Sequence, residues 1–459
     1  MSSRRQFIKD AALLSGGLML SSSFLANCVC PGKKKVIIIG AGFAGLMAAY
    51  TLHKRNIDFE ILESRDRIGG RVFSHFFGGS DNLVVELGAE WVGLDHNLLI
   101  SLCKEFNLEL EDNRFKTQAI YRGEYHQRLD DIISRDWTVK YETLLADYKS
   151  LNDNQRDRID HKLDKTDWWR YLVDNGCNGR DLDLKELVDS TDFGESIREI
   201  SAFAAINEYT SNSYGSSNQM DFKIKGGNIQ LANKLLGFFK NKIRMNTHVL
   251  KVVQTNKVKV YCTDNYIAEG DKLICTAPAL AVSKIKWLPE LPESMATALD
   301  GLQYARINKN AVLCCKRFWE KEDFDMITDM PGHYFYHATK NQTAATDRGV
   351  LISYTIGDKA AVIANQSEQW RADIVSNSLY PAFGDIIRQI DQQVLQYWGN
   401  DQYSRGAYAV YGKGQWFEVF DKLTPSHIHT HFAGEHLSED WGGFMEGALE
   451  TGRDAAMKI

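Results

Sequence analysis

The chain has 459 residues, and its content of 44% hydrophobic and 25% charged residues is that of an ordinary globular protein. Because one hydrophobic core rarely grows to this length, we expect two domains. The formal net charge of −6 and the lack of a long basic run argue against nucleic-acid binding, and the eight cysteines show neither metal-ligand spacing nor a disulfide framework. No metal site is therefore expected.

The first 28 residues are expected to be a targeting signal rather than part of the fold. Residues 3–9, SRRQFIK, have the twin-arginine pattern of bacterial export, and the mildly apolar stretch 11–26 is too short and too polar to span a membrane. Residues 25–28, LANC, resemble a lipobox, the cleavage and acylation site of bacterial lipoproteins, although Asn27 replaces the usual small residue. The prediction is export to the periplasm or beyond, with the protein either free or lipid-anchored at Cys28.

A strand followed by a glycine-rich turn opens the folded part of the chain. The β-branched run 36–39 leads directly into GAGFAG at 40–45, which begins a helix. Gly40 allows the tight turn, Gly42 lets the backbone approach a pyrophosphate, and Gly45 lets helix and strand pack closely. The pyrophosphate would lie at the positive end of the helix dipole. This pattern predicts a dinucleotide site.

An acid and a second glycine turn follow. The apolar strand 59–62 ends in Glu63, which is placed to accept hydrogen bonds from a ribose. Residues 64–71, SRDRIGGR, then supply a glycine pair and an arginine, whose planar cation can neutralise phosphates. These residues suit a cofactor held permanently in an extended pose, whereas the first turn alone leaves nicotinamide and flavin both open.

The remaining chain alternates in character. Residues 83–85 look like a strand leading into ELGAEW at 86–91, and residues 96–222 are charge-rich with helical periodicity. Strand-like runs return between 243 and 278, apolar runs alternate with helical stretches from 311 to 398, and the end of the chain is glycine-rich. The expected fold class is α/β at the two ends and mixed α+β between them.

Separated motifs, in order, resemble the flavin-containing amine oxidase family, which includes flavin monoamine oxidases, L-amino-acid oxidases and polyamine oxidases. The resemblance covers residues 34–459. It rests on the E-x-R-x-R-x-G-G-R run at 63–71, KGGN at 225–228, the regions 243–249 and 268–278, YARINK at 304–309 with Phe318 and Trp319, HFAGEH at 431–436 and GFMEGA at 443–448.

The resemblance implies a Rossmann-like FAD-binding domain that is built from three chain segments and interleaved with a substrate domain of mixed sheet and helices. Carried onto this chain, the FAD-binding domain comprises residues 34–95, 223–286 and 400–459. The substrate domain comprises residues 96–222 and 287–399.

The resemblance also implies a cofactor site. The first glycines would hold the pyrophosphate and Glu63 the adenosine ribose, and the Val249 backbone would bind adenine. Glu435 would lie beside the flavin's sugar-alcohol chain or phosphates, and the Met445 backbone N–H would approach a ring carbonyl. The expected cofactor residues are Gly40, Gly42, Phe43, Ala44, Gly45, Glu63, Ser64, Arg65, Gly70, Arg71, Gly88, Ala89, Glu90, Trp91, Val249, Glu435, Gly443, Phe444 and Met445.

Four residues are expected to carry the chemistry. Lys309 lies in an apolar strand context, where a lysine needs a partner or a function. The family's lysine at this spacing holds a water against the reactive ring nitrogen and supports reoxidation. By the resemblance, Tyr408 and Phe444 flank the substrate amine, and Tyr354 matches a pocket tyrosine of the amino-acid-oxidising branch. Aromatic faces suit an amine or its cation.

Two departures from family patterns bear on how the FAD is attached and on which class of substrate is oxidised. Ala407 stands where mitochondrial monoamine oxidases carry the cysteine that bonds to the flavin, so the FAD is expected to be non-covalent. Trp91 stands where snake-venom L-amino-acid oxidases place an arginine for the substrate carboxylate, a group that normally needs a bidentate cation. This favours an amine or polyamine over an amino acid, with Arg306 or another arginine as an alternative carboxylate partner.

The leading expectation is an FAD-dependent oxidase that converts an amine to an imine, which hydrolyses to an aldehyde or ketone, while oxygen is reduced to hydrogen peroxide. An L-amino-acid oxidase is the first alternative. A flavin-dependent desaturase, isomerase or dehydrogenase with another electron acceptor is the second, and a flavin-bearing binding protein without turnover is the third. The expected partners are a small amine or amino acid and molecular oxygen.

Overall fold

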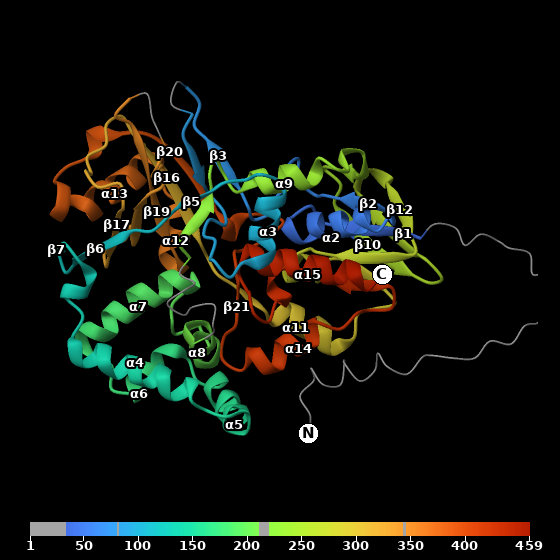
Figure 1. The fold of residues 1–459 in the computed structure, drawn as a ribbon, viewed down its shortest axis with the longest axis horizontal. Coiled ribbons are helices and arrows are strands. Elements are labelled where there is room, and N and C mark those ends of the chain that lie inside the picture. The colour runs from blue at the N-terminus through green and yellow to red at the C-terminus, as the bar shows by residue number, and fades with distance from the viewer. Residues whose placement is uncertain (1–33, 80–81, 211–219, 343–345) are drawn as a thin grey trace, which may run out of the picture. The chain divides into compact units, whose positions relative to one another are not determined.

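The computed structural model describes residues 34–79, 82–210, 220–342 and 346–459 (Figure 1). Residues 34–459 form one compact unit. The expectations for the export signal, the lipobox and Cys28 lie outside the described residues. The boundaries expected for two domains within the unit stay predictions.

A five-stranded parallel sheet underlies the first glycine turn. Its order is β22-β13-β1-β2-β9, and every neighbouring pair is parallel. Its strands come from three separate stretches of chain: β1 (Lys35–Ile39), β2 (Asp58–Leu62), β9 (Ile243–Arg244), β13 (Lys272–Cys275) and β22 (Thr430–Phe432). The expected α/β architecture is confirmed.

The side chains of β1 alternate between two cores, which explains why the whole strand is apolar. Val36 and Ile38 pack with α2 (Phe43–Lys54), whereas Ile37 and Ile39 pack against a second, four-stranded sheet. That sheet has the order β12-β11-β10-β14 and consists of β10 (Val249–Gln254), β11 (Val258–Cys262), β12 (Ile267–Gly270) and β14 (Lys286–Leu288).

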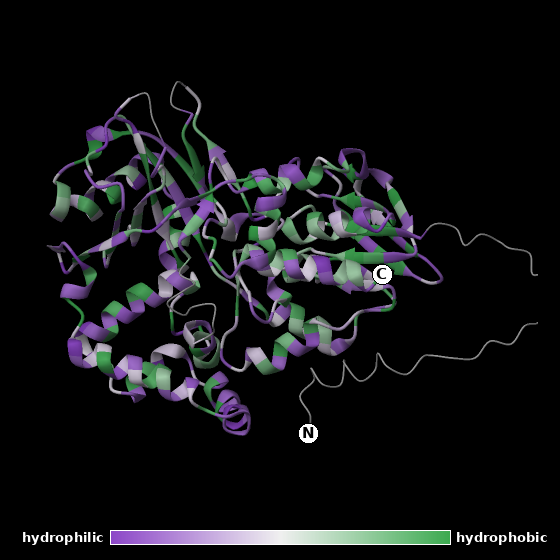
Figure 2. Ribbon diagram, in the orientation of Figure 1, coloured by the Kyte–Doolittle hydropathy of each residue, from purple (hydrophilic) through white to green (hydrophobic). Residues whose placement is uncertain are grey.

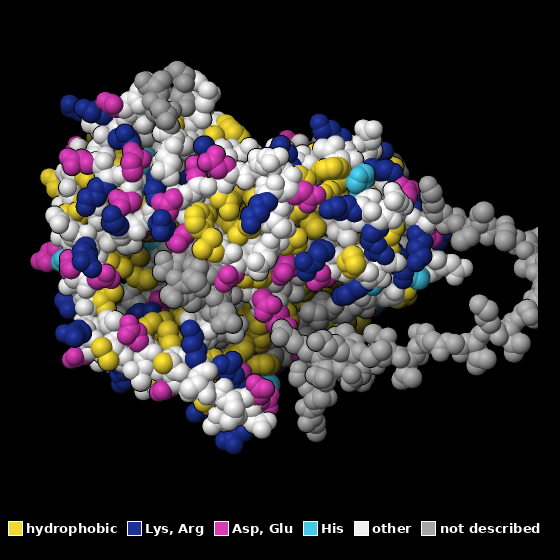
Figure 3. Space-filling view, viewed as in Figure 1, with side chains coloured by type: hydrophobic (Ala, Val, Ile, Leu, Met, Phe, Trp, Pro, Cys, Tyr) yellow, Lys and Arg dark blue, Asp and Glu magenta, His cyan; other side chains and the backbone are white. Residues whose placement is uncertain are grey.

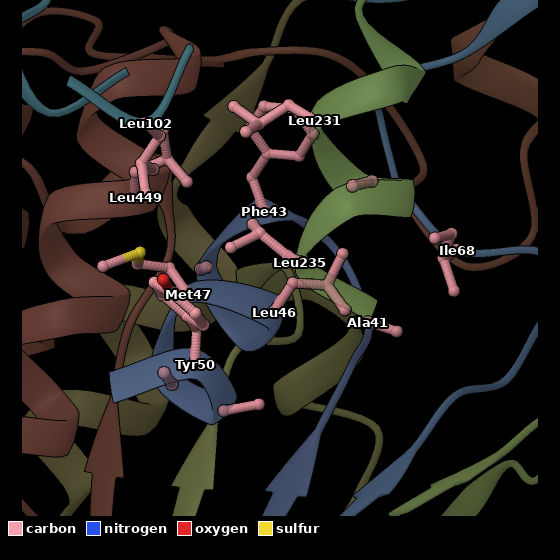
Figure 4. Close-up of a cluster of buried hydrophobic side chains, with 14 of the residues drawn as sticks. Ala41, Phe43, Leu46, Met47, Tyr50, Ile68, Leu102, Leu231, Leu235 and Leu449 are labelled. Atoms are coloured by element: carbon pink, nitrogen blue, oxygen red, sulfur yellow. The ribbon is translucent and has the colours of Figure 1, made fainter. Parts of the chain in front are cut away.

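Helix α2 packs along α15 (Met445–Met457), so both ends of the folded unit share one core. The approach is close, because a Cβ at Gly452 would lie 2.1 Å from the Ala44 carbonyl oxygen. Figure 4 shows leucines of three helices gathered around α2: Leu102 of α3 (Asn97–Glu105), Leu231 and Leu235 of α9 (Ile229–Leu236), and Leu449 of α15.

A seven-stranded mixed sheet forms the other large element, with the order β20-β16-β19-β18-β17-β6-β7. One of its faces packs on α13 (Glu368–Phe383). The opposite face packs on helices from residues 135–210, the middle segment. The strands are β6 (Lys116–Tyr121), β7 (Glu124–His126), β16 (Asn308–Cys314), β17 (Phe324–Thr328), β18 (Tyr334–His337), β19 (Gly349–Thr355) and β20 (Ile390–Tyr397).

Residues 135–210 are largely helical, as their periodicity predicts, whereas residues 110–126, for which the same helical character was expected, form three strands, two of which pair with distant parts of the chain. Ser134, Asn152 and Asp167 each cap a helix by accepting a backbone N–H, and Asn152 forms a capping box with Gln155. In Figure 2 these helices mix hydrophilic and hydrophobic residues along their length. They are α4 (Arg135–Lys149), α5 (Asp153–Asp164), α6 (Trp168–Asp174), α7 (Gly179–Phe193) and α8 (Ala202–Thr210).

Short ladders and helices connect these parts. The ladders pair β3 (Ser74–Phe76) with β4 (Val84–Glu86), β5 (Leu110–Asp112) with β8 (Phe222–Ile224), and β15 (Gln303–Tyr304) with β21 (Ala409–Val410). The remaining helices include α10 (Ala279–Val282), α11 (Glu293–Gly301), α12 (Gly357–Ala364) and α14 (Asp421–Leu423).

On the face shown in Figure 3, acidic and basic side chains are interspersed rather than gathered by sign. None of the helices in the described part of the chain is long and apolar enough to cross a membrane.

Candidate active site

A cavity of about 780 Å³ lies at the carboxyl ends of the parallel strands. Residues at or just after the ends of β1, β2 and β13 line one part of it, namely Gly40, Glu63 and Thr276. The face of the seven-stranded sheet that carries Lys309 and Tyr354 lines another part. Ligands of open α/β sheets bind at the carboxyl ends of the strands, so this position favours a ligand site.

The three glycines of the first turn are glycine for different physical reasons. Gly40 has φ +98°, and a Cβ at Gly45 would lie 2.0 Å from the Gly40 carbonyl oxygen, so the protein itself requires both glycines. Gly42 has φ −72°, and the nearest atom to a Cβ there would be the Gly70 Cα at 3.9 Å. Neither backbone nor packing requires glycine at position 42. A ligand that touches the turn does explain it.

A buried ion pair joins the second glycine turn to the C-terminal part of the chain. Arg71 Nη1 lies 2.7 Å from Glu435 Oε1, and the guanidinium stands over the Tyr304 ring at 5.4 Å. Burial opposes the charge of Arg71, but Glu435, Tyr304 and Asp401 together outweigh burial and raise the pKa of Arg71. Nη1 is nevertheless buried without a hydrogen bond of good geometry. Arg71 also lines the cavity, where its positive charge suits an anionic ligand.

Two further predicted cofactor residues are bound to protein groups in the structure. Glu63 accepts hydrogen bonds from the backbone N–H groups of Ala41 at 2.7 Å and Arg65 at 2.8 Å, which fixes the first turn against β2. The Arg65 guanidinium pairs with Asp401 and donates to Ser404 Oγ at 2.8 Å. Both residues still line the cavity.

Lys309 is a buried ammonium on the cavity wall, with 3% of its surface exposed. Its Nζ donates to the carbonyl oxygens of Glu86 at 3.2 Å and Gly88 at 3.0 Å, and to Glu90 Oε2 at 2.9 Å. The ring of Trp91 lies 5.0 Å away. An ammonium has three N–H donors, so these contacts fix its position.

Glu90 is the counter-charge that allows Lys309 to be buried. Its Oε2 also accepts the hydroxyl of Tyr336 at 2.5 Å, and Lys223 Nζ lies 3.9 Å from Oε1. Burial favours the neutral acid, but Lys309 and Lys223 outweigh burial and lower the pKa of Glu90. The carboxylate is therefore an anion between two buried cations.

The three predicted aromatic residues also line the cavity. Tyr354 is the strand partner of Lys309, so the two side chains project from the same face of the sheet. The Tyr408 hydroxyl donates to the Asp192 carbonyl oxygen. Gly443 touches the Tyr408 ring, since a Cβ there would lie 3.0 Å from it, and this contact brings Phe444 to the same region.

Acidic side chains that no motif predicts line the part of the cavity formed by the sheet and the middle helices: Asp192, Glu208 and Asp325. Burial and the nearby Asp189 raise the pKa of Asp192 to about 7. Burial raises the pKa of Asp325 to about 7. Among the described lining residues from 117–220 and 325–354, there is no lysine or arginine.

Comparison with known proteins agrees with this geometry. The sequence model described as "Flavin containing amine oxidoreductase" matches residues 43–459. The chain belongs to this family. Its relatives include the L-amino-acid oxidases of Gloydius halys, 25% identical over 93% of this chain and 89% of the relative, and Crotalus adamanteus, 24% identical over 93% and 87%.

Solved structures of other flavin-containing amine oxidoreductases share the fold. Putrescine oxidase bound to putrescine superimposes with a TM-score of 0.81 at 20% identity, covering 93% of this chain and 98% of that one. Cyclohexylamine oxidase from Brevibacterium oxydans IH-35A gives a TM-score of 0.81 at 20% identity, with the same coverage. Membership in the family implies a flavin and the oxidation of an amine or amino acid, with oxygen as the usual acceptor.

The residues present fit the flavin that the family implies. The open backbone at Gly42 and the charged side chain of Arg71 line the same cavity, where they suit a pyrophosphate. Of the predicted cofactor residues, Ala44 and Gly45 alone do not line the described cavity; they pack α2 against α15 and β1 instead. Lining residues that the sequence left unnamed include His248, Thr276 and Gly434.

Ala407 and Arg306, which the sequence singled out, differ in their position relative to the cavity of this flavin-containing amine oxidoreductase. Ala407 lines the cavity beside Tyr408. Arg306 does not line it: Nε and Nη2 each donate to Glu195 at 2.8 Å, and Nη1 pairs with Asp358. Arg306 is therefore the wrong candidate for a substrate carboxylate in this cavity.

Proposed function

We propose that the protein is an FAD-dependent oxidase of amines, with the FAD held non-covalently and oxygen as the electron acceptor. When bound, the flavin accepts a hydride equivalent from the carbon next to the amine nitrogen and passes the electrons to oxygen. The observation that carries the proposal is the buried ammonium of Lys309 on the wall of a cavity that also contains the glycine turn.

The protein groups around the cavity have separate tasks in this proposal. Gly42 and Arg71 would hold the pyrophosphate, and Val249 would hold the adenine end. Tyr408 and Phe444 would orient the neutral amine between aromatic faces, and the hydrogen bond from Tyr408 to the Asp192 carbonyl fixes one of these rings. Lys309 would position a water at the reactive flavin nitrogen by exchanging one of its three protein hydrogen bonds for that water.

The side chain at position 407 supports the proposal that the flavin is held non-covalently. The methyl group of Ala407 cannot form the thioether that a cysteine would form. The two glycine turns lie close together on the cavity wall, where both would contact the cofactor.

The charge of the cavity favours an amine over an amino acid. An α-carboxylate needs a cation, but Trp91 stands where venom oxidases have arginine, and Arg306 is bound by Glu195 and Asp358. The acidic groups facing the cavity would repel a carboxylate. The L-amino-acid oxidase alternative retains the support of its curated relatives at 25% identity.

A substrate panel tests the proposal. Purified protein carrying FAD is mixed with monoamines, diamines and L-amino acids, and hydrogen peroxide is measured. We expect turnover of amines with little turnover of amino acids; turnover confined to α-amino acids would contradict the amine assignment. Flavin reduced by amines but reoxidised only slowly in air would favour a dehydrogenase.

Replacement of the lysine tests the proposed catalytic group. In Lys309→Met, we expect reoxidation by oxygen to slow by about 10²-fold or more, since one positioned proton-transfer group contributes about that much. Stopped-flow absorbance of the reduced flavin measures this step separately from substrate oxidation. An unchanged reoxidation rate would remove Lys309 from the mechanism.

We also propose export by the twin-arginine route, on the pattern at residues 3–9. Lysine substitution of both Arg4 and Arg5 should retain the protein in the cytoplasm of a bacterial host, as cell fractionation would show. Cys28→Ser separates the two remaining alternatives: loss of membrane association would indicate lipidation, and no change would indicate a free protein.

A further inference from the structure

Asp325 is a buried carboxylate on the cavity wall whose hydrogen bonding is incomplete. Only 3% of its surface is exposed. Its Oδ2 accepts the Tyr334 hydroxyl at 2.8 Å and the Thr117 hydroxyl at 3.1 Å. Its Oδ1 is buried and has no hydrogen-bond partner among the described residues. A buried carboxylate oxygen without a donor is costly, so a bound ligand with an N–H group would complete the hydrogen bonding of this side chain.

The sheet register places this carboxylate on the catalytic face. Lys309 pairs with Tyr354, Tyr354 with Tyr334, and Tyr334 with Ile327, so these side chains project from one face. Asp325 is two residues from Ile327 on β17 and therefore shares this face. Three strand spacings, about 14 Å, separate β16 from β17 across the sheet.

The surroundings of Asp325 suit a cation. Asp192 of α7 faces the same cavity, and its charge also acts on Tyr334. Glu208 of α8 is a third acidic lining residue. Within the described part of the chain, the lining contributed by residues 117–220 and 325–354 contains no basic side chain. A protonated nitrogen would neutralise charge and supply the donor that Oδ1 lacks.

We propose that Asp325 binds a second protonated nitrogen of the substrate, so that the amine oxidised at the flavin belongs to a diamine or polyamine. This inference rests on the proposed amine oxidase function. The reacting nitrogen would lie between Tyr408 and Phe444, and the distal ammonium would lie against the carboxylate of Asp325. Thr117 and Tyr334 hold that carboxylate by its other oxygen.

Matched substrates test the proposal. The wild-type holoenzyme and Asp325→Asn are compared on α,ω-diamines of increasing length and on monoamines with the same carbon chains. We expect kcat/KM for the best diamine to fall by about 100-fold or more in the variant, as for loss of one partner of a buried charge pair, with monoamines little changed. An equal fall for diamines and monoamines would overturn the proposal, because it would indicate a structural role.

A nearby acid supplies the control. Asp323 lies two residues before Asp325 but pairs with Lys116 at 2.8 Å, and it does not line the described cavity. Asp323→Asn should leave the preference for diamines unchanged. A loss of preference in this variant as large as that in Asp325→Asn would contradict the assignment to Asp325.

A binding measurement separates failure of this proposal from failure of the proposed function. Hexamethylene-bis(guanidinium), whose two permanently charged ends keep N–H donors, is titrated into the FAD-loaded protein by calorimetry, with hexylguanidinium for comparison. We expect the bis-guanidinium ion to bind more tightly to wild type and to lose this advantage in Asp325→Asn. If no amine is oxidised, the function fails, yet these titrations still decide the subsite; equal binding of both ions to wild type would refute it.

A conservative variant covers the case in which Asp325→Asn does not fold. Asp325→Glu keeps the charge but extends the side chain by one methylene. We expect it to retain diamine oxidation with the optimum moved to a shorter chain. An unchanged optimum length would count against contact between this carboxylate and the distal nitrogen.

Discussion

At the scale of single residues, glycines of one motif prove to be required for different reasons. Gly45 is required by packing, since its hydrogen faces the Gly40 carbonyl oxygen, whereas Gly42 has an ordinary backbone conformation and room beside it. The sequence predicts all of them equally, because spacing does not distinguish a glycine required by the fold from one required by a ligand.

Gly42→Ala should therefore separate cofactor binding from folding. We expect the variant to fold with a stability within about 0.5 kcal/mol of the wild-type apoprotein, since nothing in the protein opposes the methyl group. FAD occupancy should fall sharply, as measured by the ratio of flavin to protein absorbance. Gly45→Ala is the control and should impair folding itself; a Gly42→Ala protein that retains its flavin would contradict this role.

Glu90 should be needed for stability because it lies between two buried cations. Glu90→Gln leaves Lys309 and Lys223 without this counter-charge, and we expect unfolding free energy to fall by about 3–5 kcal/mol. Urea unfolding of the apoprotein measures the change. Glu111 lies 3.8 Å from Lys223 but does not contact Lys309 in the described contacts, so Glu111→Gln should cost less. Equal losses in the two variants would argue against a special role for Glu90.

At the scale of elements, sequence patterns anticipated the glycine turn, its flanking strands and the helices between residues 135 and 210, but not the strands between residues 110 and 126. The pairing of distant strands could not be anticipated. The parallel pairing of β6 with β17 brings Thr117 beside Asp325, and no periodicity within either strand specifies that partner. The distal acids were missed for the same reason, since an isolated aspartate carries no motif and its meaning depends on the register.

The contact between α2 and α15 should be sensitive to one methyl group. Gly452→Ala places a Cβ 2.1 Å from the Ala44 carbonyl oxygen, so the helices must separate. We expect a loss of about 1–3 kcal/mol in thermal or urea unfolding. Gly301→Ala, at the end of α11 with nothing within 4 Å of the new atom, should be neutral or slightly stabilising. A neutral Gly452→Ala would show that the contact is looser than described.

Glu446 should make stability depend on pH. Its carboxylate accepts the N–H groups of Leu98 at 2.6 Å and Leu99 at 2.8 Å, at the start of α3. Burial raises its pKa from 4.5 to about 7, while Glu450 and Arg453 act in opposite directions. The folded state therefore holds an extra proton between these values, and this contribution to stability is lost as pH rises from 4.5 to 7.

Replacement of Glu446 by an amide should change how the unfolding free energy depends on pH. Between pH 4.5 and 7.5, wild type should lose roughly 3 kcal/mol more unfolding free energy than Glu446→Gln, at about 1.4 kcal/mol per pKa unit. Urea unfolding at the two pH values measures it. Glu290→Gln, on the surface, should behave as wild type; parallel pH profiles for wild type and Glu446→Gln would contradict the assignment.

At the scale of the whole molecule, three stretches of chain meet at the cofactor site, so FAD should bind only the folded protein. Added FAD at about 1,000 times its Kd should stabilise the apoprotein by about 4 kcal/mol. A thermal-unfolding titration measures the shift. Heating followed by centrifugation should leave the flavin in the supernatant, as expected with Ala407; flavin that stays with the precipitated chain would indicate a covalent bond.

The ion pair between Arg71 and Glu435 joins two parts of the cofactor site that are synthesised at different times. The ribosome makes the glycine turn at residues 40–45 long before β22 and α15, which complete the same sheet and core. About 400 residues separate Gly45 from Met445, or roughly 20–80 s of synthesis at 5–20 residues per second. Throughout that interval the nascent chain contains the glycine turn of the cofactor site but lacks the part of the site formed near β22 and α15. We therefore expect flavin loading to follow translation of residue 445, after the segments made before it have begun to fold.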